Sequence, residues 1–368
     1  MKAPVVGSPP VVGHSIQFNY DALALIQRLQ ESKGDVFQLN ILNEDVLLFL
    51  TPSATKQIFL DPDDNFSSKH GWEFSIGPTF ENGLMLRDFD DHKYHRSLLQ
   101  NSFRRDALDK YINIIQPRID SWIEEVKQKR EFYLYKSIKQ LMFNVAVELF
   151  FDEVDYTKLN HLNQLFINSI KPATTIVRSP YPMTRMKKGL KARVELLEYF
   201  QEKSDKIDLS KETLFADLVK TNNEEAGLTN FEIAEHMIFL LLAAHDTTTS
   251  TLTSSIHFLA GNEYYQNKVK TESSTLSKTD ISDLKNGIIG EALFNESIRK
   301  YPPVPFSPRW VVRDAELDGY EIPKNTYIAA GPLVLHNDER YWEDPLAFNP
   351  ERFEDPTITH EALSLIHI

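Results

Sequence analysis

The segment His236–Ser255 reads HMIFLLLAAHDTTTSTLTSS, and it has the strongest bearing on the expected architecture. Residues 237–244 are apolar on every side and contain neither Gly nor Pro, so they predict a helix that is buried all round. Asp246 and Thr247 interrupt this run, although an unpaired buried charge is strongly unfavourable. An acid beside an alcohol in such a helix therefore requires an explanation.

Two explanations are open. In the first, Asp246 caps or pairs with a nearby group, while the Thr hydroxyls donate to carbonyls one turn earlier. In the second, the helix lines a cavity to which the carboxylate and the hydroxyl deliver protons. The segment alone favours the first explanation, and the rest of the chain bears on the choice.

The composition limits the classes of function. The 368 residues carry a net charge of −13, which argues against a nucleic-acid-binding protein. There is no cysteine, which excludes disulfides, thiolate metal sites and cysteine nucleophiles within this sequence. No apolar run is long enough for a membrane span, and the first thirty residues lack a signal-peptide pattern. We therefore expect a soluble, cytoplasmic protein.

The first sixty residues predict a small mixed α/β lobe. An amphipathic helix over 20–32 precedes two strands at 35–42 and 45–50, and a short helix begins at Pro52. Residues 61–87 are rich in Gly, Ser, Asn and aromatic residues, which predicts a long ordered loop of the kind that is commonly functional.

Helices are expected to dominate the next two hundred residues. Their predicted ranges are 90–104, 106–130, 136–150, 157–171, 186–205, 211–220, 229–260, 263–270 and 287–300. Thr229, followed by Glu232 three positions later, predicts a capping box at the start of the longest helix.

The composition changes after Tyr301, where four prolines end the helical pattern. Short strands are predicted at 310–312, 316–322 and 326–330, and residues 332–353 are expected to be irregular. No boundary of a second domain stands out, so residues 1–362 are predicted to form a single domain.

Glu296 and Arg299 lie three positions apart and can pair on one helix face. Such a pair is usually exposed and contributes little to stability. Arg352, in the downstream segment PERF, provides a third partner. Bidentate contacts from Arg352 to Glu296 would attach the irregular segment to the helix.

His92 and Arg96 lie four positions apart, on one face of a predicted helix. They form either a solvated basic patch or a pair that donates hydrogen bonds to an anionic ligand group.

Together these motifs resemble the haem-thiolate monooxygenases of the cytochrome P450 superfamily, from about Pro9 to Phe353. The matching positions, in chain order, are His92, Arg96, Phe103, Ala243, Ala244, His245, Asp246, Thr247, Thr248, Glu296, Arg299, Arg309, Asp314, Glu316, Gly319, His336, Trp342, Asp344, Pro345, Phe348, Pro350, Glu351, Arg352 and Phe353. The resemblance departs mildly at Ala244, where Gly is more frequent, and at His92, where many members have Trp.

The resemblance implies a mainly helical cytochrome P450 fold with a small β-rich lobe. It implies that Asp246 and Thr247 are catalytic, as the acid–alcohol pair that manages proton delivery during dioxygen activation. It implies haem b as the cofactor, and structural roles for Glu296, Arg299 and Arg352. The residues that it assigns to haem binding are His92, Arg96, Ala243, Arg309 and His336.

The resemblance also implies partners. These are a lipophilic small-molecule substrate, dioxygen and a separate ferredoxin or flavoprotein electron donor, which basic residues at Arg104, Arg105 and Lys110 would help to dock. The alternatives are a peroxygenase or an isomerase on the same haem scaffold, or a haem-free binding protein without catalytic activity. The Asp246–Thr247 pair argues against the first two, because enzymes that do not activate dioxygen have less use for a proton relay.

The family requires a cysteine thiolate as the iron ligand, because electron donation from the thiolate favours O–O cleavage. That cysteine follows the PERF segment in the family, and this sequence has no cysteine, so no metal ligand is assigned. The last six residues, LSLIHI at 363–368, can be back-translated into a sequencing adapter and are expected to be non-native. We therefore expect a fold that is incomplete at its C-terminus and a chain that is inactive as given.

Overall fold

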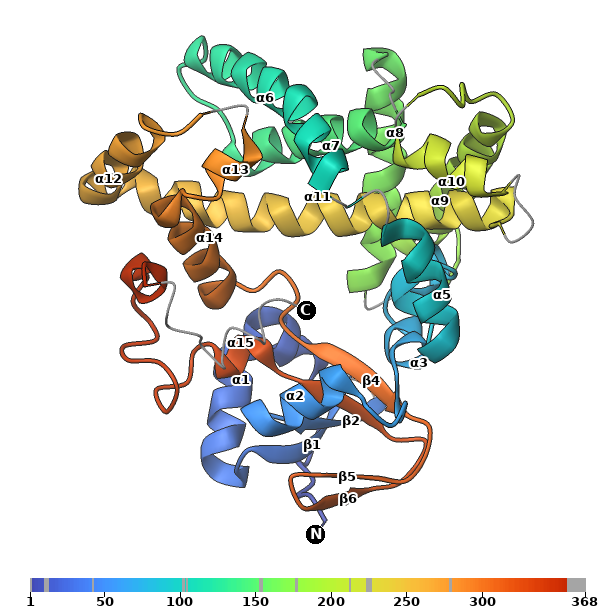
Figure 1. Ribbon diagram of the computed structural model, residues 1–368. Helices are drawn as coiled ribbons and strands as arrows, with labels where there is room; N and C mark the ends of the chain where they lie inside the picture. The colour runs from blue at the N-terminus through green and yellow to red at the C-terminus, as the bar shows by residue number, and fades with distance from the viewer. Residues whose placement is uncertain are drawn as a thin grey trace. The chain divides into compact units, whose positions relative to one another are not determined.

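The computed structural model shows a mainly helical protein with two small β-sheets, as predicted (Figure 1). It describes residues 2–9, 13–41, 43–100, 103, 105–151, 155–175, 178–211, 213–222, 227–277 and 280–355. The expected non-native tail at 363–368 and Arg104 lie outside the described residues, and the side chain of Arg105 is likewise not described.

The chain forms two compact units. Unit 1 comprises Met1–Trp72, Ser254–Asn262 and Ile288–Ile368, and unit 2 comprises Glu73–Thr253 and Glu263–Gly287. Each unit thus combines segments that are distant in the sequence. The single domain predicted over residues 1–362 stays a prediction.

The centre of unit 1 is a five-stranded sheet with the strand order β1-β2-β7-β4-β3. The strands are β1 (Val36–Ile41), β2 (Glu44–Phe49), β7 (Tyr327–Ala330), β4 (Ser307–Val311) and β3 (Phe66–Ser67). β2 and β7 are parallel, and the other neighbouring strands are antiparallel. The sheet therefore joins the N-terminal lobe to the C-terminal strands, which appear in blue and orange in Figure 1.

Both faces of this sheet are covered because its strands alternate apolar side chains between two cores. On one face Phe49 and Ile328 pack with α2 (Pro52–Leu60), which contributes Ile58. On the other face Phe37 and Leu48 pack with α1 (Ser15–Lys33), which contributes Leu25 and Ile26. The helices predicted to flank the first two strands thus provide the two layers.

The strand predicted at 316–322 is wrong, because this segment is a hairpin. β5 (Ala315–Leu317) pairs antiparallel with β6 (Tyr320–Ile322) across Asp318 and Gly319. Both turn residues have positive φ, 49° and 77°, which is the conformation that a two-residue hairpin turn requires.

The long loop predicted at 61–87 is also wrong. This segment contains β3, α3 (Ser68–Glu73), α4 (Gly77–Phe80) and a 3-10 turn, η1 (Leu84–Leu86). Elements of two to six residues are too short to show hydrophobic periodicity in the sequence. The region predicted to be irregular, 332–353, similarly contains α15 (Pro332–Leu335) and η4 (Pro350–Phe353).

Unit 2 is helical. Its remaining elements are α5 (Phe89–Gln100), α6 (Arg105–Lys127), α7 (Leu134–Phe151), α8 (Tyr156–Ile170), η3 (Lys171–Thr174), α9 (Arg185–Ser204), α10 (Leu214–Asn222), most of α11 (Asn230–Ala260), α12 (Glu263–Ser273) and α13 (Ile281–Leu284). Unit 1 additionally contains α14 (Ile288–Lys300) and the last part of α11. The predicted helices are thereby confirmed, with small shifts of their ends.

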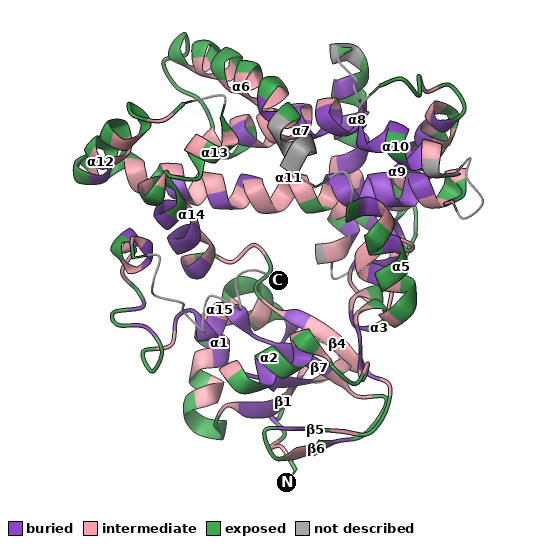
Figure 2. Cartoon of the chain, in the orientation of Figure 1, coloured by how far each residue is buried: buried purple, intermediate pink, exposed green. Residues whose placement is uncertain are grey.

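The longest helix, α11, begins at the predicted capping box. Thr229 N donates to Glu232 Oε2 at 2.9 Å, and Glu232 N donates to Thr229 Oγ1 at 3.2 Å. Residues 233–241 are buried, as Figure 2 shows for this half of the helix. The prediction that residues 237–244 are buried all round is wrong at Ala243, which is exposed. The sequence could not reveal this exposure, because a small apolar residue such as alanine fits both buried and exposed positions of a helix.

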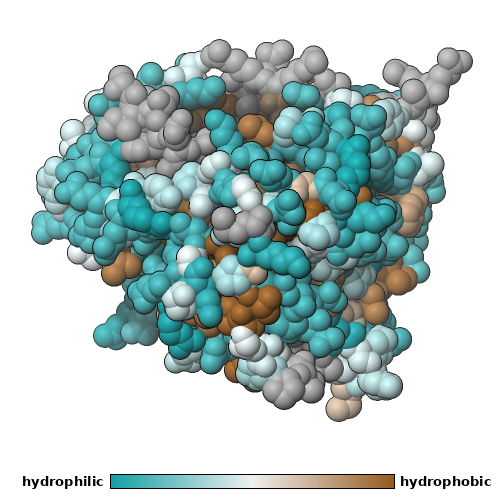
Figure 3. Space-filling model, turned by 90° about the horizontal axis from the view of Figure 1, so that it is seen from below, coloured by the Kyte–Doolittle hydropathy of each residue, from teal (hydrophilic) through white to brown (hydrophobic). Residues whose placement is uncertain are grey.

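Hydrophilic side chains predominate on the face shown in Figure 3, with hydrophobic ones gathered in small clusters. Within the part of the chain that the structure describes, none of the helices combines the length and the hydropathy needed to cross a bilayer.

Candidate functional site

The predicted acid–alcohol pair lies on α11 in unit 2, at the point where the helix is no longer fully buried. Asp246 Oδ1 lies 2.6 Å from Nζ of Lys139 on α7. Thr247 Oγ1 donates to the carbonyl of Ala243 at 2.7 Å. These are the contacts of the first explanation, in which Asp246 pairs with a nearby group and the hydroxyl bonds back along the helix.

The same back-bonding continues along the helix. The hydroxyls of Thr249, Thr251 and Thr253 each donate to the carbonyl four residues earlier, at 2.6, 3.1 and 2.7 Å. Such bonds satisfy the donor of a threonine hydroxyl within the helix itself. The threonine content of the segment is therefore compatible with a packed helix.

His245 is fully buried and connects α11 to α7. Its Nε2 lies 2.8 Å from the carbonyl of Lys139, so this nitrogen must carry the proton. The rings of Phe143 and Phe166 lie edge-on to the imidazole, at 5.6 and 5.4 Å. Burial lowers the pKa of His245, which keeps the imidazole neutral near pH 7. Lys139 thus contacts two successive residues of α11, one through its carbonyl and one through its ammonium group.

His92 and Arg96 lie on α5, also in unit 2, as predicted from their spacing. His92 is partly buried and Arg96 is exposed. The arginine is therefore accessible to an anionic group, while the role assigned to the pair stays a prediction.

The sequence interpretation missed His95, which lies between them and is buried. Its Nδ1 lies 2.9 Å from Nε2 of His236 on α11, and its Nε2 lies 3.4 Å from Oδ1 of Asp91. Burial lowers the pKa of both histidines, that of His236 to about 3. The pair is therefore neutral near pH 7, and one imidazole donates to the other. His236 is the polar residue that immediately precedes the apolar run at 237–244. This position was the signal in the sequence that could have drawn attention to it.

A second buried contact that the sequence did not reveal connects α9 to α11. The Arg193 guanidinium forms an ion pair with the carboxylate of Glu235, whose side chain is fully buried. Asn82 also donates to Glu235. Burial raises the pKa of Glu235, and the charge of Arg193 opposes that effect.

In unit 1, Glu296 and Arg299 on α14 form the predicted pair, and both side chains are fully buried. Arg299 Nε and Nη2 donate to the two carboxylate oxygens at 2.6 and 2.7 Å. The other Arg299 hydrogen bonds go to the carbonyls of His336, Pro345 and Ala347. Arg299 therefore attaches the segment after α15 to α14.

The bidentate contact predicted for Arg352 is wrong. Its Nε lies 3.7 Å from Glu296 Oε1, beyond hydrogen-bond distance, and its Nη2 donates to the carbonyl of Asp344 at 2.8 Å. The backbone N of Asn349 instead donates to Glu296 at 2.8 Å. Arg352 is therefore a third, ion-paired partner of Glu296, as predicted, but without the bidentate geometry, because Arg299 already occupies both carboxylate oxygens.

Arg309 and His336, both predicted to bind haem, lie in unit 1 on β4 and after α15. Arg309 Nη1 donates to Ser307 Oγ at 3.0 Å, and its guanidinium lies over the ring of Phe59. The His336 ring is buried, and neither ring nitrogen has a hydrogen-bond partner among the described residues. Burial lowers the pKa of His336 to about 4, so the ring is neutral near pH 7.

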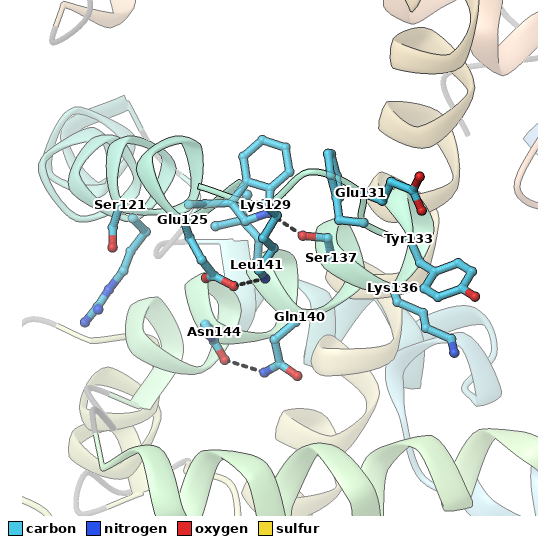
Figure 4. Close-up of a pocket in the computed structure, with 13 residues that line it drawn as sticks. Ser121, Glu125, Lys129, Glu131, Tyr133, Lys136, Ser137, Gln140, Leu141 and Asn144 are labelled. Carbon is cyan, nitrogen blue, oxygen red and sulfur yellow. Dashed lines mark hydrogen bonds and ion pairs between the residues drawn. The ribbon is translucent and has the colours of Figure 1, made fainter. Parts of the chain in front are cut away.

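A cavity of about 450 Å³ lies between α6 and α7 in unit 2 (Figure 4). Its walls combine charged and polar side chains with the apolar groups of Trp122, Phe132 and Leu141. Trp122 Nε1 donates to Ser137 Oγ across one side at 2.7 Å. None of the residues predicted to be catalytic or to bind haem lines it. This cavity is therefore separate from the predicted site, although Lys139 belongs to the same helix.

Comparisons with known proteins bear on the whole chain. The family model described as Cytochrome P450 matches residues 4–365. A relative named putative cytochrome P450 136, from two strains of Mycobacterium tuberculosis, is 32% identical over 97% of this chain and 75% of its own length. The taxane 10-beta-hydroxylase of Taxus cuspidata is 27% identical over 88% of this chain and 68% of its own length.

A solved structure of the cyanobacterial protein CYP120A1 with retinoic acid bound has the same fold. The TM-score is 0.88, with 23% sequence identity, and the match covers 98% of this chain and 83% of that one. This likeness confirms the fold predicted from the motifs.

Proposed function

We propose, from the premise that this chain belongs to the cytochrome P450 family, that it inserts one oxygen atom from dioxygen into a lipophilic small molecule. Membership of the family makes it a haem-dependent monooxygenase in the general sense. The lipophilic substrate, haem b as the particular haem, and a ferredoxin or flavoprotein as the electron donor are further parts of the proposal. The cytoplasmic location expected from the sequence stays a prediction.

Two observations support a lipophilic substrate. One relative is, by its name, a hydroxylase of a taxane, and another was solved with retinoic acid bound. In this chain, residues 61–87 and those after Pro302 are rich in aromatic and aliphatic side chains. Apolar side chains at a pocket favour an apolar ligand through the surface that they remove from water.

The residues assigned to haem binding are chemically suited to the anionic edge of that cofactor. His336 provides two buried ring nitrogens without a partner among the described residues, and Arg96 provides an exposed guanidinium. In the proposal, His92, Arg96, Arg309 and His336 bind the propionates, and Ala243 leaves space beside the macrocycle. Bound haem supplies the activation of dioxygen. The thiolate ligand is not supplied by any of these 368 residues, since none is a cysteine.

One observation supports the roles proposed for Asp246 and Thr247. The helix α11 is buried through residue 241 and is exposed at Ala243, and the acid and the alcohol, both partly buried, follow three and four residues later. In the proposal, Asp246 exchanges protons with solvent and Thr247 passes them on. To do so, Asp246 must leave Lys139, and the Thr247 hydroxyl must leave the carbonyl of Ala243.

The test is to express the protein from the full reading frame of its source gene and to record a reduced carbon-monoxide difference spectrum. We expect the absorption band at the position typical of thiolate ligation. A purified, folded protein that takes up no haem would overturn the monooxygenase proposal.

A second test concerns the acid. In the haem-loaded enzyme, Asp246→Asn should lower turnover about 10²-fold or more, since general acid–base groups contribute roughly 10²–10⁴-fold. Haem content should not change, because Asp246 is not assigned to haem binding. Thr253→Val, two turns further along the same helix, is the matched control and should retain turnover.

A further inference from the structure

The first three turns of α11 contact α5 and the segment that leads into it, and they do so through one helix face. Residues that recur every three or four positions share such a face. The residues of α11 that make these contacts are Glu232, Glu235, His236 and Phe239. Their partners, in the same order, are Arg87, Asn82, His95 and Gly83. Figure 1 accordingly shows α5 beside the start of α11.

The shortest of the polar contacts on this face joins the two histidines. Both imidazoles are buried, and 2.9 Å separates Nδ1 of His95 from Nε2 of His236. Arg87 and Glu232, by contrast, approach each other only to 3.9 Å, and the glutamate side chain is 31% exposed. A buried hydrogen bond is directional and restrains two helices more strongly than a distant ion pair that water can reach.

The surroundings of the pair determine which imidazole donates. Nε2 of His95 lies 3.4 Å from Oδ1 of Asp91 and 3.9 Å from Oε1 of Glu232, so it carries the proton, and Nδ1 of the same ring accepts. Nε2 of His236 is therefore the donor between the rings. The donors thus point from His236 through His95 to Asp91, which Arg87 binds at 3.0 Å.

The attachment of α5 depends strongly on this contact. The buried residues of this 12-residue helix are His95 and Leu99. At 3.6 residues per turn, His95 lies about 60° from His92 and about 100° from Arg96 around the helix axis. A bond that fixes His95 therefore also fixes the directions in which these two predicted haem-binding residues point.

We propose that His95 and His236 are positioning residues, which fix α5 on α11 so that His92 and Arg96 meet the haem propionates, and that this attachment weakens in acid. The attachment itself concerns only helices of this chain, whereas the part about haem rests on the proposed function. A proton on Nδ1 of His95 would leave two N–H groups facing each other, and a proton on Nδ1 of His236 would place a charge in a fully buried position.

Charged groups from several elements surround the pair. Those that act on the pKa of one or both imidazoles are Arg87, Asp91 and Glu232. α10, which also packs against α5, carries Asp217 and Lys220, and these pair with each other at 3.3 Å. On the side of α9, Arg193 pairs with Glu235.

The direction of the pH effect follows from the lowered pKa values. Burial lowers the pKa of His95, and it lowers the pKa of His236 to about 3. Both folded-state values lie below the ordinary value of 6.5, so the neutral pair contributes its full stability above that pH. Its contribution declines as the pH falls from 6.5 towards the folded-state values.

The test follows the transfer of haem from the haem-loaded enzyme to apomyoglobin, by visible absorption, at pH 7.5 and pH 5.5. We expect transfer to be faster at pH 5.5. At pH 7.5, His95→Leu should raise the transfer rate about 10-fold, because a buried hydrogen bond is worth on the order of one decade in an equilibrium constant.

His236→Gln separates the positioning role from a general loss of stability. The glutamine amide offers a donor in place of Nε2 but does not titrate, so transfer at pH 7.5 should stay within about 2-fold of the parent rate. The acceleration between pH 7.5 and pH 5.5 should fall to about half or less, since one of the two titrating rings is gone. His257→Gln makes the same change at an exposed histidine of the same helix and should behave like the parent protein.

A second measurement needs no haem. His95→Leu should speed hydrogen exchange of the α5 amides in the 368-residue chain, with no change for α14 in unit 1. If even the parent protein from the full reading frame takes up no haem, the proposed function fails. Faster exchange in α5 would then still support the attachment by the histidine pair, and unchanged exchange would overturn it.

Three results with the haem-loaded enzyme would overturn the proposal. One is a parent-like transfer rate in His95→Leu together with parent-like acceleration in His236→Gln. Another is an equal change in the control His257→Gln. The third is slower transfer in acid, which would assign the titration to His92, because a protonated His92 would bind the propionates more strongly.

Discussion

Two carboxylate–cation pairs on different helices illustrate how burial changes what an ion pair does. Glu296 and Arg299 in unit 1 are both fully buried, and two hydrogen bonds join them. Asp246 and Lys139 in unit 2 meet through one contact of 2.6 Å, with side chains that are 27% and 19% exposed. In the first pair, a planar guanidinium faces a planar carboxylate. In the second pair, an ammonium group at the end of a flexible side chain contacts one carboxylate oxygen.

This difference separates a structural pair from an adjustable one. The guanidinium of Arg299 also donates to three backbone carbonyls, so moving it would leave several buried groups without partners. Lys139 and Asp246 can each exchange their contact for water. Of the two carboxylates, only Asp246 is therefore in a position to change partners during a reaction cycle.

The largest expected effect follows from removing Arg299. Arg299→Ala removes both guanidinium hydrogen bonds of the buried Glu296 carboxylate and leaves it with Asn349 N and the more distant Arg352. It should lower the free energy of unfolding by about 3–5 kcal/mol. Urea unfolding monitored by circular dichroism checks this. Arg299→Lys should recover only part of the loss, since an ammonium group cannot reproduce the planar contacts. A loss below about 1 kcal/mol for Arg299→Ala would contradict the structural role.

The buried contact between His95 and His236 joins two neutral side chains, and it can be compared with the two ion pairs. His236 has a folded-state pKa of about 3, below the ordinary value of 6.5. Below pH 6.5 the unfolded chain therefore binds a proton that the folded protein does not, and the free energy of unfolding should fall as the pH falls from about 6.5 towards about 3. Each unit of pKa difference corresponds to about 1.4 kcal/mol.

The measurement is urea unfolding at pH 7 and pH 5, above the range in which most carboxylates titrate. His236→Leu should reduce the dependence on pH in this interval. The same slope in the parent protein and in this variant would show that another group is responsible.

A smaller effect is expected for the partly exposed pair Lys139–Asp246. Lys139→Met should lower the free energy of unfolding by less than about 1 kcal/mol, because a partly exposed pair gains little over its hydration. A double-mutant cycle with Asp246→Asn, followed by urea unfolding, measures the coupling. A coupling of 3 kcal/mol or more would place this pair with Glu296–Arg299 instead.

The smallest effect is expected for Arg340, which has many contacts but lies at the surface. It pairs with Asp35 at 2.7 Å and with Asp338 at 2.6 Å, and its side chain is 49% exposed. Arg340→Ala should lower the free energy of unfolding by roughly 0.5 kcal/mol, and added salt should reduce the difference. A loss comparable to that of Arg299→Ala would show that the number of contacts matters more than burial.

The predicted features that the structure confirms depend on neighbours along the chain. The capping box of Thr229 and Glu232 and the pair Glu296–Arg299 each span three residues, so helix geometry places the partners together. The predicted partnership of Arg352 with Glu296 is present as an ion pair, but its bidentate geometry is not, because that geometry depends on which donors already surround Glu296. The roles assigned to Asp246, Thr247, His92, Arg96, Ala243, Arg309 and His336 stay predictions.

The amino-acid sequence sufficed for the helical class, the approximate ends of the helices, the small β-rich lobe and the motif order that is typical of the family. These follow from periodicity and from short-range spacing, which act within a few turns of chain. The tertiary structure was needed to reveal that Lys139 contacts Asp246, that His95 contacts His236, and that Ala243 is exposed. The first two contacts join residues 107 and 141 positions apart, and folding brings such residues together through packing of whole helices, which no local pattern records.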